Sequence, residues 1–383
     1  MTCFAPLRAA ASITVAASAL AIVPSTAATA HDNHQSNARQ GIAEPIVIAH
    51  RGASGYRPEH TLAAYRLAIQ LGADNIEPDL VSTKDGVLVA RHENEISGTT
   101  DVADHPEFAD RNTTKTIDGR AVTGWFTEDF TLAELRTLGA VERLPQVRPD
   151  NTRYDGRFQV PTFDEVLDLA RTESRRRGRT IGVYPETKHP TYFDSLGLSL
   201  EEPLVRALKR HGLDRRAAPV FVQSFETANL RDLDTMTKVP LVQLADASGA
   251  PYDTVAAGTP TPYRQMVSPR GLREIASYAD GLGANKFLVI PRDPVTSAAG
   301  EPTEVVDDAH AEGLIVHIWT TRDENQFMAK DYWRGEDPNA KGDAQAEIHA
   351  FLDEGVDGFF TDFPDTGADA REAWLEELTR TTG

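Results

Sequence analysis

The sequence predicts an α/β fold of the TIM type, a closed (β/α)8 barrel with a small insertion after the second strand. From Ile46 onward, eight short runs rich in β-branched residues alternate with segments whose apolar residues recur at helical spacing. Eight strand–helix units indicate a closed parallel barrel rather than an open sheet. The length of 383 residues exceeds one average domain but is common for a barrel with insertions.

The apolar runs predict the strands, and the helical spacing of apolar residues in the segments between them predicts the helices. The expected strands are Ile46–His50, Asn75–Leu80, Thr180–Glu186, Val220–Ser224, Leu241–Ala245, Asp280–Gly283, Ile315–Trp319 and Gly358–Asp362. After the first strand, Leu62, Tyr65 and Ile69 recur at the spacing of one helical face. This spacing predicts the first of the helices that connect the strands.

One stretch breaks the alternation of strands and helices. The residues from about 93 to 160 are polar, rich in Thr, Asp and Arg, and contain one expected helix, Thr131–Leu138, with Thr131 as its N-cap. A segment of this length inside a barrel is an insertion rather than a connection. Because it follows the second strand, we expect it over the face where barrel enzymes place their active sites.

The first thirty residues have the features of a secretory signal peptide. Arg8 is the only charged residue before the apolar run 9–23, and Ala28-Thr29-Ala30 fits an A-x-A cleavage site. Cleavage after Ala30 would remove Cys3, the only cysteine, and with it any disulfide or thiolate chemistry. We therefore expect a secreted, extracellular protein.

The rest of the chain divides simply. Residues 31–43 are expected to form a flexible lead-in, and residues 44–370 to form the barrel with its insertion. Residues 371–383 are expected to form a C-terminal tail or helix.

The charge of the chain limits its partners. A formal net charge of -19 argues against nucleic acid and against anionic membrane surfaces, because no basic face is available to replace counterions. The apolar run near the N-terminus is too short for a stable membrane anchor. The sequence indicates no obligate protein partner. An acidic protein can still act on a phosphodiester where a metal ion locally reverses the field.

Two acidic residues share one strand at its carboxyl end. Side chains alternate along a strand, so Glu77 and Asp79 point to one face, roughly 6–7 Å apart at their Cα atoms. Oxygen ligands of this kind suit a hard cation such as Ca²⁺ or Mg²⁺. The alternative is a solvated acidic strand end. On the third strand, Glu186 could add a third carboxylate and Lys188 could hold a phosphate oxygen, although an exposed Glu/Lys pair is common.

Histidines and cations lie at the ends of neighbouring strands. His50 ends the first strand, Arg51 offers a planar fork for phosphate, and Gly52 allows a sharp turn. Arg91 and His92 follow a short hairpin after the second strand. Two histidines can serve as general acid and base near neutral pH, although a single histidine is more often structural. Since all these groups fall at carboxyl ends of the first three strands, they indicate one active site.

A set of short motifs runs along the chain in order from about Ile46 to Asp365. The motifs are His50-Arg51-Gly52, Pro58-Glu59-His60-Thr61, Glu77-Pro78-Asp79, Thr83-Lys84-Asp85-Gly86, His92, Glu186-Thr187-Lys188, Trp319-Thr320, Gly355-Val356-Asp357-Gly358 and Thr361-Asp362-Phe363-Pro364. Together they resemble a known family, the glycerophosphodiester phosphodiesterases of the secreted or periplasmic type.

The resemblance implies a TIM-type barrel and a divalent metal ion, most often Ca²⁺, with Mg²⁺ as the alternative. It implies the following site residues: Glu77, Asp79 and Glu186 as metal ligands, His50 and His92 as the acid/base pair, Arg51 and Lys188 on the phosphate, and Glu59 and Trp319 in the pocket wall. The segment 320–325 departs from the usual pattern of the family on the alcohol side of the pocket.

The expected reaction is metal-dependent hydrolysis of a small glycerophosphodiester to sn-glycerol 3-phosphate and an alcohol. Close alternatives are a phosphodiesterase acting on teichoic acid or on a lysophospholipid. A barrel glycosidase also uses paired carboxylates, but these normally come from different strands. A secreted binding protein without activity is a further alternative, against which the two histidines argue.

Overall fold

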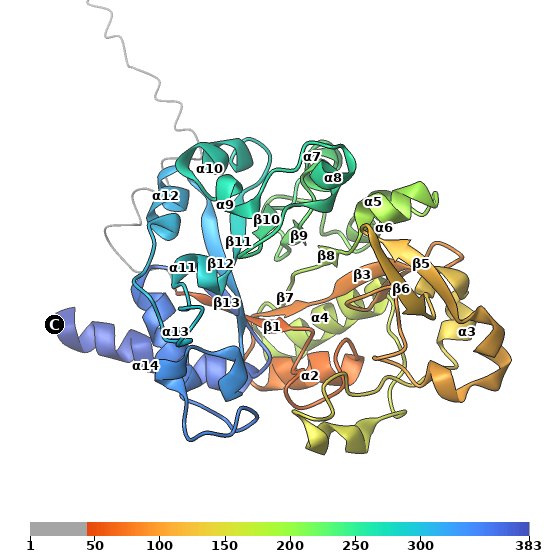
Figure 1. Cartoon of the computed structure of the whole chain (residues 1–383), viewed down its shortest axis with the longest axis horizontal. Coiled ribbons are helices and arrows are strands. Elements are labelled where there is room, and N and C mark those ends of the chain that lie inside the picture. Colours follow the sequence, from red (N-terminus) through yellow and green to blue (C-terminus); the bar gives the residue numbers. More distant parts are fainter. Residues whose placement is uncertain (1–43, 383) are drawn as a thin grey trace, which may run out of the picture. The chain divides into compact units, whose positions relative to one another are not determined.

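A computed structural model describes residues 44–382 of the chain. The predicted signal peptide, residues 1–30, and the predicted lead-in, residues 31–43, lie outside the described residues. The described part contains all eight predicted strands, arranged as a curled sheet with helices on its outside (Figure 1).

Eight parallel strands pair in a closed ring. The first is β1 (Ile46–His50), and the second is formed by β2 (Asn75–Glu77) and β3 (Asp79–Ser82). The third is formed by β7 (Gly182–Val183) and β8 (Glu186–Thr187). The others are β9 (Val222–Ser224), β10 (Leu241–Ala245), β11 (Gly281–Asn285), β12 (Ile315–Thr321) and β13 (Gly358–Thr361). Each strand pairs in parallel with the next, and β13 also pairs with β1, which closes the barrel.

The second and third strands are each split at a proline. Pro78 separates β2 from β3, and Pro185 lies between β7 and β8. Proline has no N–H to donate to a neighbouring strand, so the ladder is interrupted at these positions. Both interruptions lie beside acidic residues of the predicted site, Glu77 and Glu186 respectively.

Helices connect the strands, and the longer ones pack on the outside of the barrel (Figure 1). The connecting helices are α2 (Leu62–Gln70), α4 (Phe163–Arg177), α5 (Pro190–Ser195), α6 (Glu201–Arg210), α7 (Thr227–Met236), α8 (Tyr252–Ala256), α9 (Tyr263–Met266), α10 (Pro269–Ile275), α11 (Lys286–Val289), α12 (Val305–Ala311), α13 (Ala344–Asp353) and α14 (Pro364–Thr382). In α2 the predicted face is buried at Tyr65 and Ile69. Residues 371–382 continue α14, so the predicted boundary after residue 370 lies inside this helix. No helix within residues 44–382 combines the length and the apolar character needed to cross a membrane.

The core has two parts. A large cluster fills the space between the strands and the helices. A small cluster of four buried residues, Ile48, Tyr184, Val242 and Phe360, comes from four different strands. Because residues of separate strands meet there, this cluster fills the barrel interior beneath the site.

The insertion contains more structure than the sequence predicted. After the hairpin of β3 with β4 (Leu88–Ala90), it forms a second hairpin of β5 (Thr113–Ile117) and β6 (Arg120–Gly124). The predicted helix is shorter, α3 (Leu132–Leu135), but the predicted N-cap Thr131 is confirmed and makes a capping box with Glu134. Four short 3₁₀ helices are η2 (Val102–Asp104), η3 (Pro106–Arg111), η4 (Thr127–Asp129) and η5 (Pro149–Tyr154). The hairpin was missed because its strands are mostly exposed and show no alternation of buried and polar residues.

A second long excursion separates β12 from α13. It contains the 3₁₀ helices η6 (Asn325–Phe327) and η7 (Lys330–Tyr332). The segment 320–325, which departs from the family pattern, covers the end of β12 and the start of this excursion, and Asn325 is fully buried.

Candidate active site

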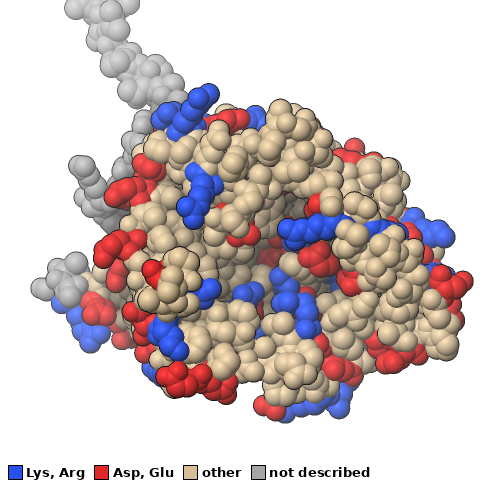
Figure 2. All heavy atoms as spheres, viewed as in Figure 1, with Lys and Arg blue, Asp and Glu red and all other residues tan. Residues whose placement is uncertain are grey.

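A cavity opens at the carboxyl ends of the barrel strands, with a volume of ≈ 230 Å³. The space-filling view in Figure 2 shows this face hollowed near its centre, with acidic and basic side chains gathered around the hollow. The predicted site residues that line the cavity are His50, Arg51, Glu77, His92, Glu186, Lys188 and Trp319. The structure therefore brings most of the predicted site together around one space.

The three predicted carboxylates form an acidic cluster. Oxygen atoms of Glu77, Asp79 and Glu186 all lie within 4.8 Å of one another, and all three residues are buried. The parallel pairing of β3 with β8 places Asp79 directly beside Glu186. Three converging oxygen donors on a rigid sheet fit a hard divalent cation.

The pKa values of the acidic cluster also favour a bound divalent cation. Burial and the charge of Asp79 raise the pKa of Glu77 well above its ordinary value, and burial raises the pKa of Glu186 to about 8. Asp79 behaves differently, because Lys188 and His60 outweigh its burial and hold its pKa well below the ordinary value. Without a cation the cluster therefore repels itself, and a divalent ion between the oxygens would remove this repulsion.

Two further contacts hold the acidic cluster in place. The backbone N–H of Arg51 donates to Oε2 of Glu77 at 2.7 Å, and Nε2 of His60 lies 2.8 Å from Oδ2 of Asp79. His60 is fully buried and also contacts the hydroxyl of Tyr65 at 2.8 Å. The sequence reasoning gave His60 no role, although it lies in a quoted motif.

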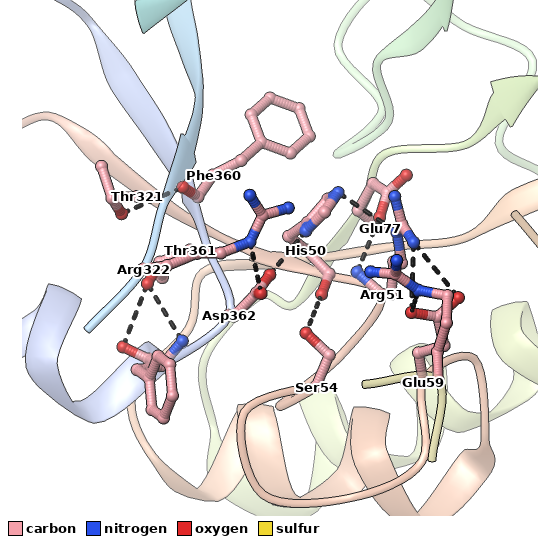
Figure 3. Close-up of polar contacts among 12 residues, drawn as sticks. His50, Arg51, Ser54, Glu59, Glu77, Thr321, Arg322, Phe360, Thr361 and Asp362 are labelled. Carbon is pink, nitrogen blue, oxygen red and sulfur yellow. Dashed lines mark hydrogen bonds and ion pairs between the residues drawn. The ribbon is translucent and has the colours of Figure 1, made fainter. Parts of the chain in front are cut away.

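His50 is held as a neutral imidazole. Its Nδ1 lies 2.6 Å from Oδ1 of Asp362, and Nε of Arg51 donates to its Nε2 at 3.2 Å (Figure 3). Because an arginine can only donate, Nε2 is the acceptor and Nδ1 carries the proton. Burial and the charge of Arg51 lower the pKa of His50 to about 4. His50 is therefore able to accept a proton at Nε2.

A buried ionic network stands behind His50. Asp362, at the end of β13, also accepts from Nη2 of Arg148 at 2.6 Å and from Nε of Arg322 at 2.7 Å. Arg148 belongs to the insertion and binds Glu324 at 2.7 Å, so the insertion is tied to the barrel here. No role was predicted for these residues from the sequence. The position of Asp362 at the carboxyl end of the eighth strand could have indicated a place in the site.

The turn after β1 requires unusual backbone geometry. Arg51 and Gly52 both have positive φ, at 61° and 86°. A Cβ atom at Gly52 would lie 2.7 Å from the backbone carbon of Ala64, which leaves no room for a side chain. The predicted turn at Gly52 is thus confirmed.

The guanidinium of Arg51 lies between acids. Its Nη1 donates to Oε2 of Glu59 at 3.1 Å, and its Nε lies 3.5 Å from Oδ2 of Asp79. Glu59 is buried behind Arg51 and also binds Arg143 at 2.7 Å. Glu59 therefore positions Arg51 from behind instead of forming the cavity wall.

Arg91 and His92 separate in the structure. Arg91 is fully buried and donates to the carbonyl oxygens of His60 and Thr99, so it takes no part in the cavity. His92 lines the cavity and lies 3.4 Å from Nζ of Lys188. Burial, with the charges of Arg51 and Lys188, lowers the pKa of His92 to about 3.

A chain of ionic contacts joins His92 to the insertion. Nδ1 of His92 lies 2.8 Å from Glu93, whose other oxygen lies 2.8 Å from Nε2 of His189. Nδ1 of His189 in turn lies 2.6 Å from Asp118 in the turn between β5 and β6. The two carboxylates outweigh burial and raise the pKa of His189 to about 9. His189 is therefore a charged link between the segment that follows β4 and the turn of the β5–β6 hairpin.

We expect His189 to make stability depend on pH. Since its pKa is raised on folding, its stabilisation is fully present below about pH 6.5 and is lost as the pH rises through about 9. In a His189→Gln variant the free energy of unfolding should fall by roughly 1–3 kcal/mol at about pH 6, and by much less at about pH 10. Urea unfolding of both proteins at the two pH values measures this, and a pH-independent difference would contradict it.

Aromatic residues form the wall away from the acidic cluster. Trp319 donates from Nε1 to the carbonyl of Gly283 at 2.9 Å and packs edge-on against Phe225, with ring centroids 5.6 Å apart. Phe287 and Phe327 also line the cavity. Trp319 therefore occupies the predicted place in the pocket wall.

A parallel barrel with carboxylates, imidazoles and cations at its carboxyl face defines an enzyme with a site for an anionic substrate. Residues 50–366 match the model of the glycerophosphoryl diester phosphodiesterase family. A glycerophosphodiester phosphodiesterase of Arabidopsis thaliana, GDPD6, is 38% identical over 332 residues, which are 83% of this chain and 84% of that protein. One from Haemophilus influenzae is 29% identical over 93% of this chain and 97% of that protein.

Solved structures agree on the fold. A phosphodiesterase of Oleispira antarctica, solved in complex with the product sn-glycerol-3-phosphate, has a TM-score of 0.56 at 19% identity. The match covers 86% of this chain and 97% of that chain. The chain belongs to the glycerophosphoryl diester phosphodiesterase family and is thus an enzyme, a phosphoric diester hydrolase.

Proposed function

We propose that the protein hydrolyses glycerophosphodiesters to sn-glycerol 3-phosphate and an alcohol, with a divalent cation held by Glu77, Asp79 and Glu186. The observation that carries the proposal is the acidic cluster, whose oxygens converge within 4.8 Å beside two cations, Arg51 and Lys188. The activity named for the relatives and the product bound to the Oleispira protein support the substrate class.

Calcium is the proposed ion, with magnesium as the alternative. The donor set is made of carboxylate oxygens only, which suits a hard cation better than zinc. A bound divalent cation would supply positive charge against the charge that builds on the phosphate in the transition state. The remaining chemistry falls to side chains of the chain itself.

We assign the role of first base to His50. Its Nε2 is free of a proton, and Asp362 beside Nδ1 stabilises the imidazolium formed when Nε2 accepts one. The proton comes from the glycerol 2-hydroxyl as its oxygen attacks phosphorus and forms a cyclic phosphate. Arg51 and Lys188 orient the phosphate oxygens.

We assign the role of first acid to His92. It protonates the alcohol as the bond from phosphorus to the alcohol oxygen breaks. The negative charge of a bound substrate offsets the cations, Arg51 and Lys188, that lower the pKa of His92 in the free protein. In the second step the roles exchange. His92 accepts a proton from a water molecule whose oxygen attacks phosphorus, and His50 returns its proton to the glycerol 2-oxygen as the bond from that oxygen to phosphorus breaks.

The site does not favour a barrel glycosidase. Paired carboxylates of glycosidases flank a sugar across roughly 5–10 Å and normally come from different strands. Here Glu77 and Asp79 lie two residues apart on one barrel strand, and all three acidic oxygens lie within 4.8 Å. Three converging acidic oxygens suit a cation better than the two flanking carboxylates of a glycosidase.

The proposed place of action is outside the cell. The support is the signal-like sequence of residues 1–30, with its apolar run and its A-x-A site before residue 31. Measuring the N-terminus of protein recovered from the culture medium tests this proposal, with a start at His31 as the expected result. Retention of the full-length chain inside the cell would contradict it.

The reaction is tested by release of sn-glycerol 3-phosphate from glycerophosphoglycerol, which carries no charge on its alcohol. We expect activity to be lost after treatment with EDTA and restored by added CaCl₂, and less strongly by MgCl₂. Full activity after chelation would contradict metal dependence. Failure to release glycerol 3-phosphate from any glycerophosphodiester would contradict the function itself.

A further inference from the structure

The side of the cavity opposite the acidic cluster carries only positive charge. The acidic cluster lies on the second and third strands of the ring, whereas β11 and β12 are the sixth and seventh. Three cations follow these two strands and line the cavity, and we call them the cationic wall: Lys286, Arg292 and Arg322. Within residues 44–382, the only carboxylates in the cavity lining are Glu77 and Glu186 of the acidic cluster. The far half of the cavity therefore presents cations without a facing acid.

Two of these cations have their counterions behind them. Nζ of Lys286 lies 2.8 Å from Glu347, which is buried, and Arg322 binds the buried Asp362. Neither acid reaches the cavity lining. Both cations are thus fixed by acids on their outer side, while their inner side faces the cavity.

Arg292 is different. Within residues 44–382 it makes no ion pair, and its one hydrogen bond runs from Nη1 to the carbonyl of Met328 at 3.4 Å. Burial lowers the pKa of Lys286, and the charges of Arg322 and Arg292 add to this effect. Arg292 is therefore the cation of the wall whose charge no acid of the described residues neutralises.

Three phenylalanines of the cavity lining already have a cation of the protein over their rings. Nζ of Lys188 lies 5.7 Å from the ring centroid of Phe225. The guanidinium of Arg292 lies 4.7 Å from that of Phe287, and the guanidinium of Arg322 lies 4.6 Å from that of Phe327. A quaternary ammonium needs free aromatic faces or carboxylates to bind. Among the described residues of the lining, only Trp319 and Phe360 are aromatic residues without such a cation, and the cationic wall has no carboxylate beside it in the lining.

We propose that the alcohol side of this cavity selects alcohols that carry their own phosphate and disfavours alcohols that carry an ammonium group. The proposal rests on the proposed function and names its preferred substrate class. The glycerol moiety is neutral, so only the alcohol can place a negative charge against the cationic wall. Two sources share this chemistry, a small phosphorylated glycerol and a chain of poly(glycerol phosphate).

A matched set of three substrates tests the preference. These are glycerophosphoglycerol, the same molecule with a terminal phosphate monoester, and glycerophosphocholine. We expect kcat/KM to be about 10-fold or more higher for the phosphate-bearing substrate than for glycerophosphoglycerol, and lowest for glycerophosphocholine. The preference should shrink in about 1 M NaCl, because salt screens the attraction. Equal or higher kcat/KM for glycerophosphocholine would overturn the proposal.

An Arg292→Gln variant locates the preference. The ratio of kcat/KM between the phosphate-bearing substrate and glycerophosphoglycerol should fall about 10-fold in this variant. The control is Arg334→Gln, since Arg334 is exposed, pairs with Asp343 and does not line the cavity. An unchanged ratio in Arg292→Gln would overturn the assignment of the subsite.

A third measurement separates the two sources. If poly(glycerol phosphate) is cleaved with a kcat/KM close to that of the small phosphorylated substrate, the polymer is a substrate of the site. A much lower value shows that the site prefers the small molecule. If none of the substrates releases glycerol 3-phosphate, the proposed function fails. If all are cleaved without preference, the function stands and the cationic wall has no role in selection.

Discussion

Replacing His50 by alanine is expected to lower kcat by about 10²–10⁴-fold, the range usual for loss of a general acid or base. The physical reason is that the variant loses the proposed acceptor of the hydroxyl proton, Nε2 of His50, together with the support that Asp362 gives at Nδ1. His92→Ala should have an effect of similar size, because it removes the partner that protonates the alcohol. Single-turnover assays of glycerol 3-phosphate release at saturating calcium measure both losses.

The two histidine variants need a control for simple loss of structure. His105→Ala suits this purpose, since His105 lies in the insertion, contacts Asp101 and Glu107, and does not line the cavity. It should keep kcat within about 2-fold, as expected of a surface substitution away from the site. Turnover that barely changes in His50→Ala or His92→Ala would refute the acid/base assignment.

The second large effect is expected in a Glu186→Gln variant. Removing one acid of the acidic cluster removes a ligand oxygen charge, so affinity for calcium should fall by about 10–100-fold or more, and activity at low calcium with it. Without calcium the same change relieves repulsion between buried carboxylates. The variant should therefore unfold at the same or a higher temperature than the unchanged protein in EDTA.

Thermal unfolding with and without calcium separates these contributions. Calcium should raise the Tm of the unchanged protein, because a ligand that binds only the folded state stabilises it. It should raise the Tm of Glu186→Gln much less. Glu202→Gln is the matched control, since Glu202 is exposed on α6, and it should respond to calcium like the unchanged protein. An equal calcium shift in Glu186→Gln would contradict the proposed metal site.

Much of the site could be predicted because side chains alternate between the two faces of a strand. Glu77 and Asp79 lie two residues apart on one barrel strand, so their side chains share one face, and Glu186 lies near the end of the next strand. Local sequence therefore already places all three on the inner side at one end of the barrel. The same logic places His50 and Arg51 at the end of the first strand. What only the tertiary structure shows is how close the three carboxylates lie, because the pairing of β3 with β8 places Asp79 beside Glu186.

The insertion could not be predicted in this way. The hairpin of β5 and β6 has mostly exposed strands, so it lacks the periodic burial from which secondary structure is inferred. The hairpin contacts His189 through Asp118, a turn residue that lies 71 positions away in the chain. Local sequence carries no information on a contact of that kind.

By itself the sequence determined the barrel, the acidic strand ends and the histidines at the mouth, because these follow from short-range periodicity and from the direction of parallel strands. Only the tertiary structure decided which partners hold those groups and what the far wall contains. His50 and Asp362 are 312 positions apart and meet because β13 closes the ring against β1. Closure of the ring likewise sets the cationic wall opposite the acidic cluster, since residues on separate strands become neighbours across a cavity only when the barrel is complete.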